Sequence, residues 1–151
     1  MRDILLLPFT VACVVPFLIH RGAAPWMPDG LVWRVIGGAL LAAGLALFAF
    51  TVALFVRKGR GTLAPWTPTQ RLIISGPYRY CRNPMISGVL FVLIGETLLL
   101  RSAPIGVEAL VFFAVNTTYF ILKEEPDMQA RFGAEYTAYK ARVPRWVPKV
   151  W

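Results

Sequence analysis

The chain has 151 residues, of which 57% are hydrophobic, and its mean hydropathy is +0.59. This apolar content exceeds what a soluble domain of that length can bury, so we exclude a soluble globular protein and predict a single all-α integral membrane domain over residues 1–151. The formal net charge of +8 is explained by anionic lipid head groups, and no nucleic-acid-binding motif accompanies it, so we expect no nucleic-acid partner.

Four apolar segments predict about four transmembrane helices, at residues 4–19, 35–56, 85–100 and 105–122. At ~1.5 Å per residue the second segment crosses the roughly 30 Å hydrocarbon core alone, whereas the first and third are marginal in length. We therefore predict two N-terminal spans (1–56), a cytosolic loop (57–84), a helical hairpin (85–122) and a cytosolic tail (123–151).

The basic residues indicate the orientation. Four spans put both termini on one side of the membrane, and that side then holds thirteen of the sixteen Lys and Arg residues, while Arg21, Arg34 and Arg101 lie on the other. Cytoplasmic loops retain positive charge. We therefore expect both termini in the cytoplasm, membrane lipids as partners, and a bacterial inner membrane as the location of so compact a chain.

The chain offers no pattern for a disulfide or a metal centre. Cys13 lies in the first span and Cys81 in the cytosolic loop, so they lie at different levels and we expect both to stay reduced. His20 is the single histidine, and there is no Cys-x-x-Cys pair. We expect no zinc site and no metal in the mechanism.

The second span is rich in small residues, which let a neighbouring helix approach closely. We predict close helix packing there, with room for a lipid tail as the alternative, at Gly37, Gly38, Ala39, Ala42, Ala43, Gly44 and Ala46. Residues 102–104 leave almost no slack between the third and fourth spans, which must form an antiparallel hairpin. Such a hairpin presents its two cytoplasmic ends together.

A basic, aromatic loop, Gly-Pro-Tyr-Arg-Tyr-Cys-Arg-Asn-Pro, occupies residues 76–84 and leads into the third span. Glu124 and Glu125 follow the fourth span. Because the hairpin brings these segments together, Arg79 and Arg82 are the expected partners of the two glutamates. The arrangement is either an interfacial salt bridge or a pocket that offers carboxylates and guanidinium groups to a ligand of mixed charge.

The tail after Pro126 predicts an amphipathic cytosolic helix, because its apolar residues recur at helical spacing. They are Met128, Phe132, Tyr136 and Tyr139. Two interpretations stay open. The helix lies on the bilayer surface, or it is a lid that closes a site at the mouth of the hairpin.

Three sequence blocks together resemble the isoprenylcysteine carboxyl methyltransferase and phospholipid methyltransferase superfamily. They are Gly-Pro-Tyr-Arg-Tyr-Cys-Arg-Asn-Pro-Met-Ile-Ser-Gly at 76–88, Glu-Glu at 124–125, and Phe-Gly-x-Glu-Tyr-x-x-Tyr-x-x-Arg-Val-Pro at 132–144. The ordered match covers roughly the C-terminal half of the chain. The resemblance implies an integral membrane enzyme that binds S-adenosylmethionine in a cytosolic pocket without a Rossmann domain.

Carried over by position, the resemblance implies Arg82 and Glu125 as catalytic residues. The residues that it implies for cofactor binding are Pro77, Tyr78, Arg79, Arg82, Asn83, Pro84, Gly88, Glu124, Glu125, Tyr136 and Arg142. Tyr78, Tyr136, Arg142 and Arg145 are candidates for a pocket wall or lid, whereas Trp146 and Trp151 are expected to be interfacial anchors. Asn83 replaces the common His and loses a titratable group. Ile86 replaces a frequent Tyr, which suggests a different substrate surface.

Three polar residues lie inside the predicted hairpin, Glu96, Glu108 and Asn116. A carboxylate within a span is rare enough to suggest a functional site. We favour hydrogen-bonded helix contacts for all three, because the motifs of the resemblance place the methyl donor at the opposite face.

The function that these expectations favour is methyl transfer from S-adenosylmethionine to a lipophilic acceptor that enters from the bilayer. A carboxylate acceptor is already nucleophilic at pH 7, whereas an amine must first lose a proton, which Glu125 or Glu124 would accept. The alternatives are a phospholipid amine N-methyltransferase, a sterol-reductase-like enzyme that uses a nicotinamide cofactor, and a non-catalytic small membrane protein. The short chain, with few spans before the motifs, speaks against the reductase.

Overall fold

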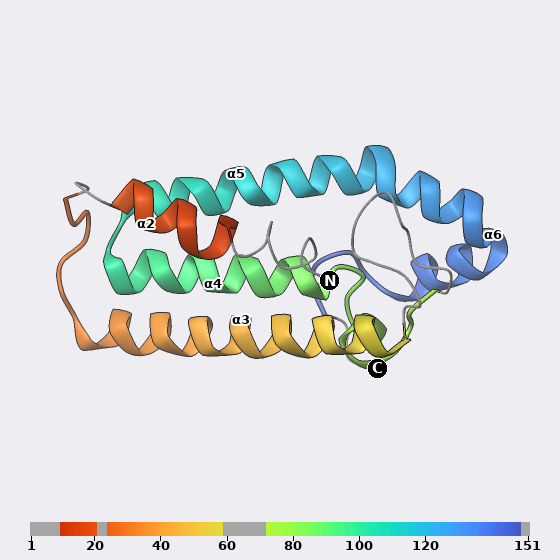
Figure 1. Ribbon diagram of the computed structural model, residues 1–151, viewed down its shortest axis with the longest axis horizontal. Coiled ribbons are helices and arrows are strands. Elements are labelled where there is room, and N and C mark those ends of the chain that lie inside the picture. Colours follow the sequence, from red (N-terminus) through yellow and green to blue (C-terminus); the bar gives the residue numbers. More distant parts are fainter. Residues whose placement is uncertain (1–9, 21–23, 59–71, 149–151) are drawn as a thin grey trace.

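The described part of the computed structural model, residues 10–20, 24–58 and 72–148, is helical and contains no strand, which confirms the all-α prediction (Figure 1). The helices are the π-helix η1 (Thr10–Val14), α2 (Val15–His20), α3 (Leu31–Lys58), the 3₁₀-helix η2 (Gly76–Arg79), α4 (Pro84–Leu100), α5 (Ala103–Tyr119), the π-helix η3 (Phe120–Glu124) and α6 (Glu125–Arg142).

Three long helices lie side by side, with α4 between α3 and α5, and the short α2 lies against α4 and α5 near their connection (Figure 1). By length and composition, two helical stretches can cross a membrane: Leu31–Leu54, and the apolar part of the helical stretch Ala103–Arg142. The apolar helices Thr10–His20 and Pro84–Leu100 are shorter, as their predicted spans are. Residues 4–9 of the first predicted span lie outside the described residues, and the count of four spans stays a prediction.

The predicted close packing of the second span is confirmed at two of its glycines. A Cβ atom on Gly44 would lie 2.7 Å from the carbonyl oxygen of Gly88, and one on Gly95 would lie 2.8 Å from that of Gly37. Helices α3 and α4 therefore meet backbone to backbone at two levels. Gly38 does not take part, because a Cβ there would meet no atom within 4 Å.

The predicted antiparallel hairpin is formed by α4 and α5, and it holds the apolar core. Leu93 and Ile105 are fully buried, together with Val89 and Ala109. The turn between the helices is held by the amide of Ser102, which donates to the carbonyl of Thr97 at 3.1 Å. The N-terminus of α4 and the C-terminus of α5 are thereby directed toward the same end of the molecule.

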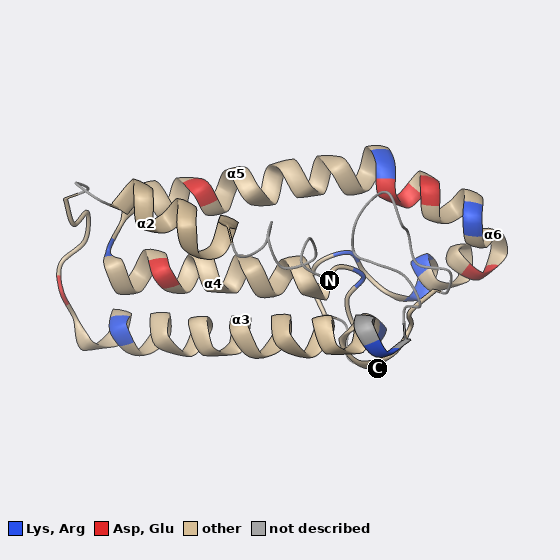
Figure 2. Ribbon diagram, viewed as in Figure 1, with Lys and Arg blue, Asp and Glu red and all other residues tan. Residues whose placement is uncertain are grey.

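Most of the described charged residues lie toward that end, around the start of α4 and along α6 (Figure 2). Asp29, Arg34 and Arg101 lie at the opposite end of the molecule, and Glu96 and Glu108 lie within the apolar helices α4 and α5, where one buried oxygen of each has no hydrogen-bond partner. The expected hydrogen-bonded contacts are therefore absent at these atoms. Asn116 does form a hydrogen bond, but it donates to the carbonyl of Phe112 in its own helix, at 2.8 Å.

The helix predicted in the tail is present, but it is kinked. Helix α6 turns back on itself at Gly133, whose φ of 51° and ψ of −122° suit glycine (Figure 1). The side-chain amide of Gln129 donates to Thr137 at 2.9 Å and to the carbonyl of Gly133 at 3.0 Å, so it holds the two halves together. The returning half buries Tyr136, Tyr139 and Val143 against Leu72, Met128 and Phe132.

We expect Gly44→Ala to destabilise the protein and Gly38→Ala to leave it as stable or more so. The added methyl group at residue 44 overlaps the backbone of α4 and should cost about 1–3 kcal/mol, whereas at residue 38 it meets open space and raises helix propensity by about 0.5–1 kcal/mol. Unfolding in mixed detergent micelles measures both. Equal stability of the two variants would contradict the close contact of α3 and α4.

Candidate functional site

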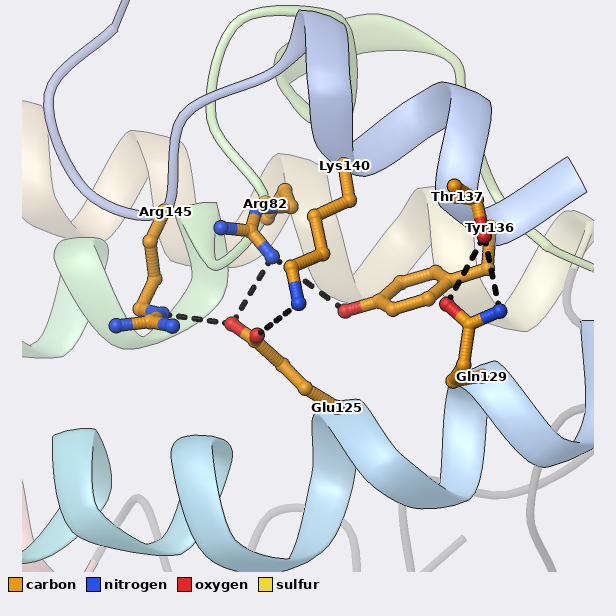
Figure 3. A network of polar contacts seen from close by, with 7 residues as sticks. All are labelled: Arg82, Glu125, Gln129, Tyr136, Thr137, Lys140 and Arg145. Carbon is orange, nitrogen blue, oxygen red and sulfur yellow. Dashed lines mark hydrogen bonds and ion pairs between the residues drawn. The ribbon is translucent and has the colours of Figure 1, made fainter. Parts of the chain in front are cut away.

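The mouth of the hairpin brings together two residues that are 43 positions apart. Arg82 lies just before α4, Glu125 opens α6, and Nη1 of Arg82 lies 2.9 Å from Oε1 of Glu125 (Figure 3). Each side chain is only 11% exposed. The predicted pairing of the basic loop with the glutamate pair is confirmed for these two residues.

The π-helix η3 places Glu125 on the inner side. In a regular α-helix, residues five positions apart point about 140° away from each other. Here the amide of Glu125 bonds the carbonyl of Phe120, the i to i+5 pattern of a π-turn, which brings the two residues closer to one face. Both are buried as a result.

Glu125 is the centre of an ion-pair network, to which the returning tail adds two further cations. Its Oε1 also accepts from Nε of Arg145 at 2.7 Å, and its Oε2 lies 3.4 Å from Nζ of Lys140 (Figure 3). Burial alone raises the pKa of Glu125, but the hydrogen bonds and charges of Arg145, Arg82 and Lys140 outweigh it and the pKa is lowered. Glu125 therefore stays ionised.

Glu124 has the opposite environment. Burial, followed by the charges of Glu125 and Asp127, raises the pKa of Glu124 to about 7. Among the described residues its carboxylate forms no ion pair or hydrogen bond. Two adjacent carboxylates thus differ in role: one is committed to three cations, and the other is able to take up or release a proton near neutral pH.

The segment after α6 lies across the loop that precedes α4. The amide of Arg82 donates to the carbonyl of Pro144 at 2.9 Å, and the thiol of Cys81 donates to that of Arg145 at 3.2 Å. The ring of Trp146 packs on Phe113 and Phe120, with ring centroids 5.1 and 5.7 Å apart. Trp146 therefore packs against α5 and η3, and its expected role as an interfacial anchor stays a prediction. Trp151 lies outside the described residues.

Tyrosines form the wall behind the network. The hydroxyl of Tyr136 lies 3.5 Å from Nη1 of Arg82, and that of Tyr139 donates to the carbonyl of Tyr78 at 2.7 Å. Burial is the main cause that raises the pKa of all three phenols. They remain neutral at physiological pH and act as hydrogen-bonding, water-excluding walls.

Several residues implied by the resemblance lie away from the network. Arg79 and Arg142 are exposed, and neither forms an ion pair with a described residue. Gly88 lies against α3, where a Cβ would meet the backbone of Phe48 at 3.0 Å, so packing explains this glycine. Pro77 is in η2. Asn83 precedes Pro84, the buried first residue of α4, and its side chain makes no capping bond.

Lys140 and Cys81 were not predicted as site residues from the sequence, and Arg145 was predicted only as a wall or lid residue. Their contacts depend on the reversal at Gly133, which carries the second half of α6 back toward Arg82. A glycine inside a helical pattern was the available signal. The lid interpretation agrees with this geometry, since the returning half covers the side of Glu125 (Figure 3).

A family model described as phospholipid methyltransferase matches residues 33–135. The chain belongs to the phospholipid methyltransferase family. An uncharacterized protein of Haemophilus influenzae is 32% identical over 63 residues, which are 42% of this chain and the whole of that protein.

Membership confirms the resemblance, and it indicates a membrane methyltransferase of the phospholipid or isoprenylcysteine type. The phospholipid methyltransferase match contains Arg82 and both glutamates, but it ends before Lys140, Arg145 and Trp146.

Glu125→Gln should destabilise the protein by about 3 kcal/mol at pH 7, because it leaves the buried Arg82 without its charge partner. Because folding lowers the pKa of Glu125, its ionised form stabilises the folded protein above its ordinary pKa of 4.5. This stabilisation is lost as the pH falls through the lowered pKa of the folded state. Unfolding in micelles should therefore show a constant difference at pH 6–8 that shrinks below 4.5. The exposed Glu135→Gln is the matched control.

Glu124→Gln should have the opposite effect. A raised pKa means that the folded protein prefers the protonated carboxyl, so the stability of the wild type falls as the pH rises from 4.5 to about 7 and stays low above it. The variant should be more stable than the wild type at pH 8 and indistinguishable from it at pH 4.5 in the same unfolding assay. A loss of stability at pH 8 would contradict the environment described for Glu124.

Proposed function

We propose that the chain is an S-adenosylmethionine-dependent methyltransferase whose acceptor is lipophilic and comes from the bilayer. The observation that carries the proposal is the juxtaposition, at one end of an apolar hairpin, of the paired Arg82 and Glu125 with the unpaired Glu124. These residues lie within the part of the chain that matches the phospholipid methyltransferase family. Family membership gives a membrane methyltransferase, and the proposal adds the cofactor and the lipophilic nature of the acceptor.

The residues at the site fit the charges of that cofactor, which carries a carboxylate, an ammonium group and a sulfonium. Nε of Arg82 is buried and has no hydrogen-bond partner, so a donor is available for the carboxylate. Glu124 offers a carboxylate without a cation of its own. We assign Arg82, Glu124 and the neighbouring Tyr78 and Tyr136 to cofactor binding.

When bound, the cofactor supplies a methyl group on a positively charged sulfur: the lone pair of the acceptor forms the new bond to carbon, while the electrons of the carbon–sulfur bond return to sulfur. The protein therefore needs to align the reactants and exclude water. Glu125 holds Arg82 in place, so we give it a positioning role, in contrast to the catalytic role that the sequence implied. Glu124 would take the proton that an amine acceptor releases.

The outer surface of α5 suits an acceptor in the membrane. Large apolar side chains are exposed on it, including Leu110, Val111 and Val115, and lipid would cover them. We place the charged end of the hairpin at the cytoplasmic face of a bacterial inner membrane, because it carries most of the basic residues. The acceptor then reaches the site from the cytoplasmic leaflet.

A phospholipid amine N-methyltransferase is the second candidate, and the environment of Glu124 favours it. An amine must lose a proton before or during methylation, and a carboxylate with a pKa of about 7 is suited to accept it. Transfer of labelled methyl groups to a total lipid extract distinguishes the products. A base-labile methyl ester indicates a carboxylate acceptor, and a base-stable methylamine indicates an amine.

Calorimetry with S-adenosylhomocysteine, on protein in nanodiscs, tests the cofactor. Arg82→Gln and Glu124→Gln should each weaken binding about tenfold, or ~1.4 kcal/mol, whereas Glu135→Gln should change it less than twofold. Absence of saturable binding to the folded wild-type protein in both detergent and nanodiscs would reject the methyltransferase proposal and favour a non-catalytic membrane protein.

The affinity for S-adenosylmethionine should also depend on pH. If an ionised Glu124 holds a positive charge of the cofactor, affinity should rise about tenfold in total as the pH rises through the pKa of about 7, and it should level off above that value. Titrations at pH 5.5, 6.5, 7.5 and 8.5 measure this profile. Glu124→Gln should flatten it, and a flat profile in the wild type would remove Glu124 from the cofactor site.

A further inference from the structure

The second half of α6 and the segment that follows it, residues 134–148, are joined to the rest of the protein mainly by side chains. Among the described helices, α6 packs extensively only against η3, which it continues. Residues 134–148 reach the rest of the molecule through a small apolar cluster, the rings around Trp146, ion pairs and single hydrogen bonds. Segments that are held by few packed helices open locally before a protein unfolds as a whole.

The ion pairs of Glu125 divide between one fixed partner and two partners in this segment. Arg82 is fixed, because it lies just before α4, and each side chain of the Arg82–Glu125 pair is 11% exposed. Lys140 and Arg145 approach Glu125 from the returning segment, and their side chains are 51% and 26% exposed (Figure 3). Water and salt screen exposed pairs more than buried ones. The ion pairs that hold the segment are therefore easier to break than the pair with Arg82.

Gly133 is placed to act as a hinge between the two halves of α6. Its φ of 51° and ψ of −122° lie outside the helical region, whereas the residues on both sides of it are helical. A Cβ atom on Gly133 would meet no atom within 4 Å, so the backbone conformation, and not packing, requires a glycine there. The hydrogen bond between Gln129 and Thr137, which spans the kink, is exposed to solvent. Rotation at this one residue would carry residues 134–148 away together.

The segment covers an atom that a ligand has to reach. Nε of Arg82 is buried and has no hydrogen-bond partner, and the amide of the same residue donates to the carbonyl of Pro144 at 2.9 Å. A ligand from solution therefore reaches Nε only if residues 134–148 move. The indole N–H of Trp146 is also buried without an acceptor, which lowers the free-energy cost of opening.

We propose that residues 134–148 form a lid that opens and closes as a unit about Gly133, and that the ion pairs of Lys140 and Arg145 with Glu125 hold it closed over Arg82. When the lid opens, Glu125 keeps Arg82 as its partner and loses the two other cations. The inference goes beyond the proposed function, because it states how any ligand of Arg82 enters and leaves.

Cys81 is a native reporter of opening, because the lid covers it. Its side chain is 4% exposed, and its thiol donates to the carbonyl of Arg145 at 3.2 Å. Cys13 is the other cysteine of the chain, so in a Cys13→Ser background the rate of modification by iodoacetamide in detergent micelles measures the fraction of open protein. We expect this rate to rise with salt concentration, because salt screens the ion pairs of the lid. A rate that does not change with salt would contradict their role.

Lys140→Gln and Lys123→Gln separate the ion pairs of the lid from surface charge in general. Lys140 pairs with Glu125 from within the lid, whereas Lys123 pairs with Asp127 outside it. The first variant should raise the rate of Cys81 modification about fivefold, which is the effect of one half-exposed ion pair, and the second less than about twofold. Equal rates in the two variants would overturn the assignment of Lys140 to closure.

Gly133→Ala tests the hinge, and Gly38→Ala is the matched control. A Cβ atom at either residue would meet no atom within 4 Å, but Gly133 has a φ of 51°, whereas Gly38 lies in the regular helix α3. Alanine at residue 133 should strain the closed conformation and raise the rate of Cys81 modification about tenfold. At residue 38 it should leave the rate unchanged. Equal rates in the two variants would overturn the hinge.

Two further buried positions distinguish opening of the lid from unfolding of the whole protein. Thr51 in α3 and Ser102 in the turn between α4 and α5 are fully buried. Thr51→Cys or Ser102→Cys, in a chain that also carries Cys13→Ser and Cys81→Ser, should react at least about tenfold more slowly than Cys81, and Lys140→Gln should not change their rates. If these thiols react as fast as Cys81, the lid does not open on its own and the proposal is wrong.

Saturating S-adenosylhomocysteine relates the lid to the proposed function. If this compound binds Arg82 beneath the lid, it should slow the modification of Cys81 about fivefold or more. An unchanged rate in protein that calorimetry shows to be saturated would contradict a lid that closes over Arg82. If the wild type does not bind S-adenosylhomocysteine, the variants of Lys140 and Gly133 still decide the lid, and the methyltransferase proposal alone fails.

Discussion

The structure of this end of the molecule depends on the ion pairs of the desolvated Glu125 carboxylate. A buried carboxylate is stable only if charges and hydrogen bonds replace its water, and here they come from three places in the chain: the loop before α4, the second half of α6 and the segment that follows it. Each of these segments is ordered around the same two oxygen atoms. The hairpin mouth, the returning helix and the tail therefore form one structural unit.

The contrast between the two adjacent glutamates has a local cause. The π-turn before them directs Glu125 into the cations, while Glu124 is partly buried beside other carboxylates and has no cation of its own. One residue is kept ionised and immobile, and the other is poised to exchange a proton. Separating a positioning charge from a titratable one in this way is a common arrangement in sites that handle both charge and protons.

The apolar helices explain how a small chain holds such a polar site at a membrane surface. The glycine contacts between α3 and α4 bring two backbones together, and the short turn at Ser102 fixes α5 against α4. These contacts set the position of Arg82 at one end of α4 relative to Glu125 beyond α5. The tail then covers the polar end, with Trp146 lying where the ion pairs meet the aromatic rings of the bundle.

Local sequence patterns determine much of this architecture. Apolar runs specify the helices, and glycines in the second span specify close packing. A three-residue connection forces the hairpin that brings Arg82 to Glu125. These features can be predicted because they follow from chain geometry and from the burial of apolar surface. The roles within the site do not follow from such patterns. They depend on the π-turn, on the reversal at Gly133 and on the contacts of Arg145 and Trp146, because the pKa of a carboxylate is set by groups brought near it in space, whatever their distance along the chain.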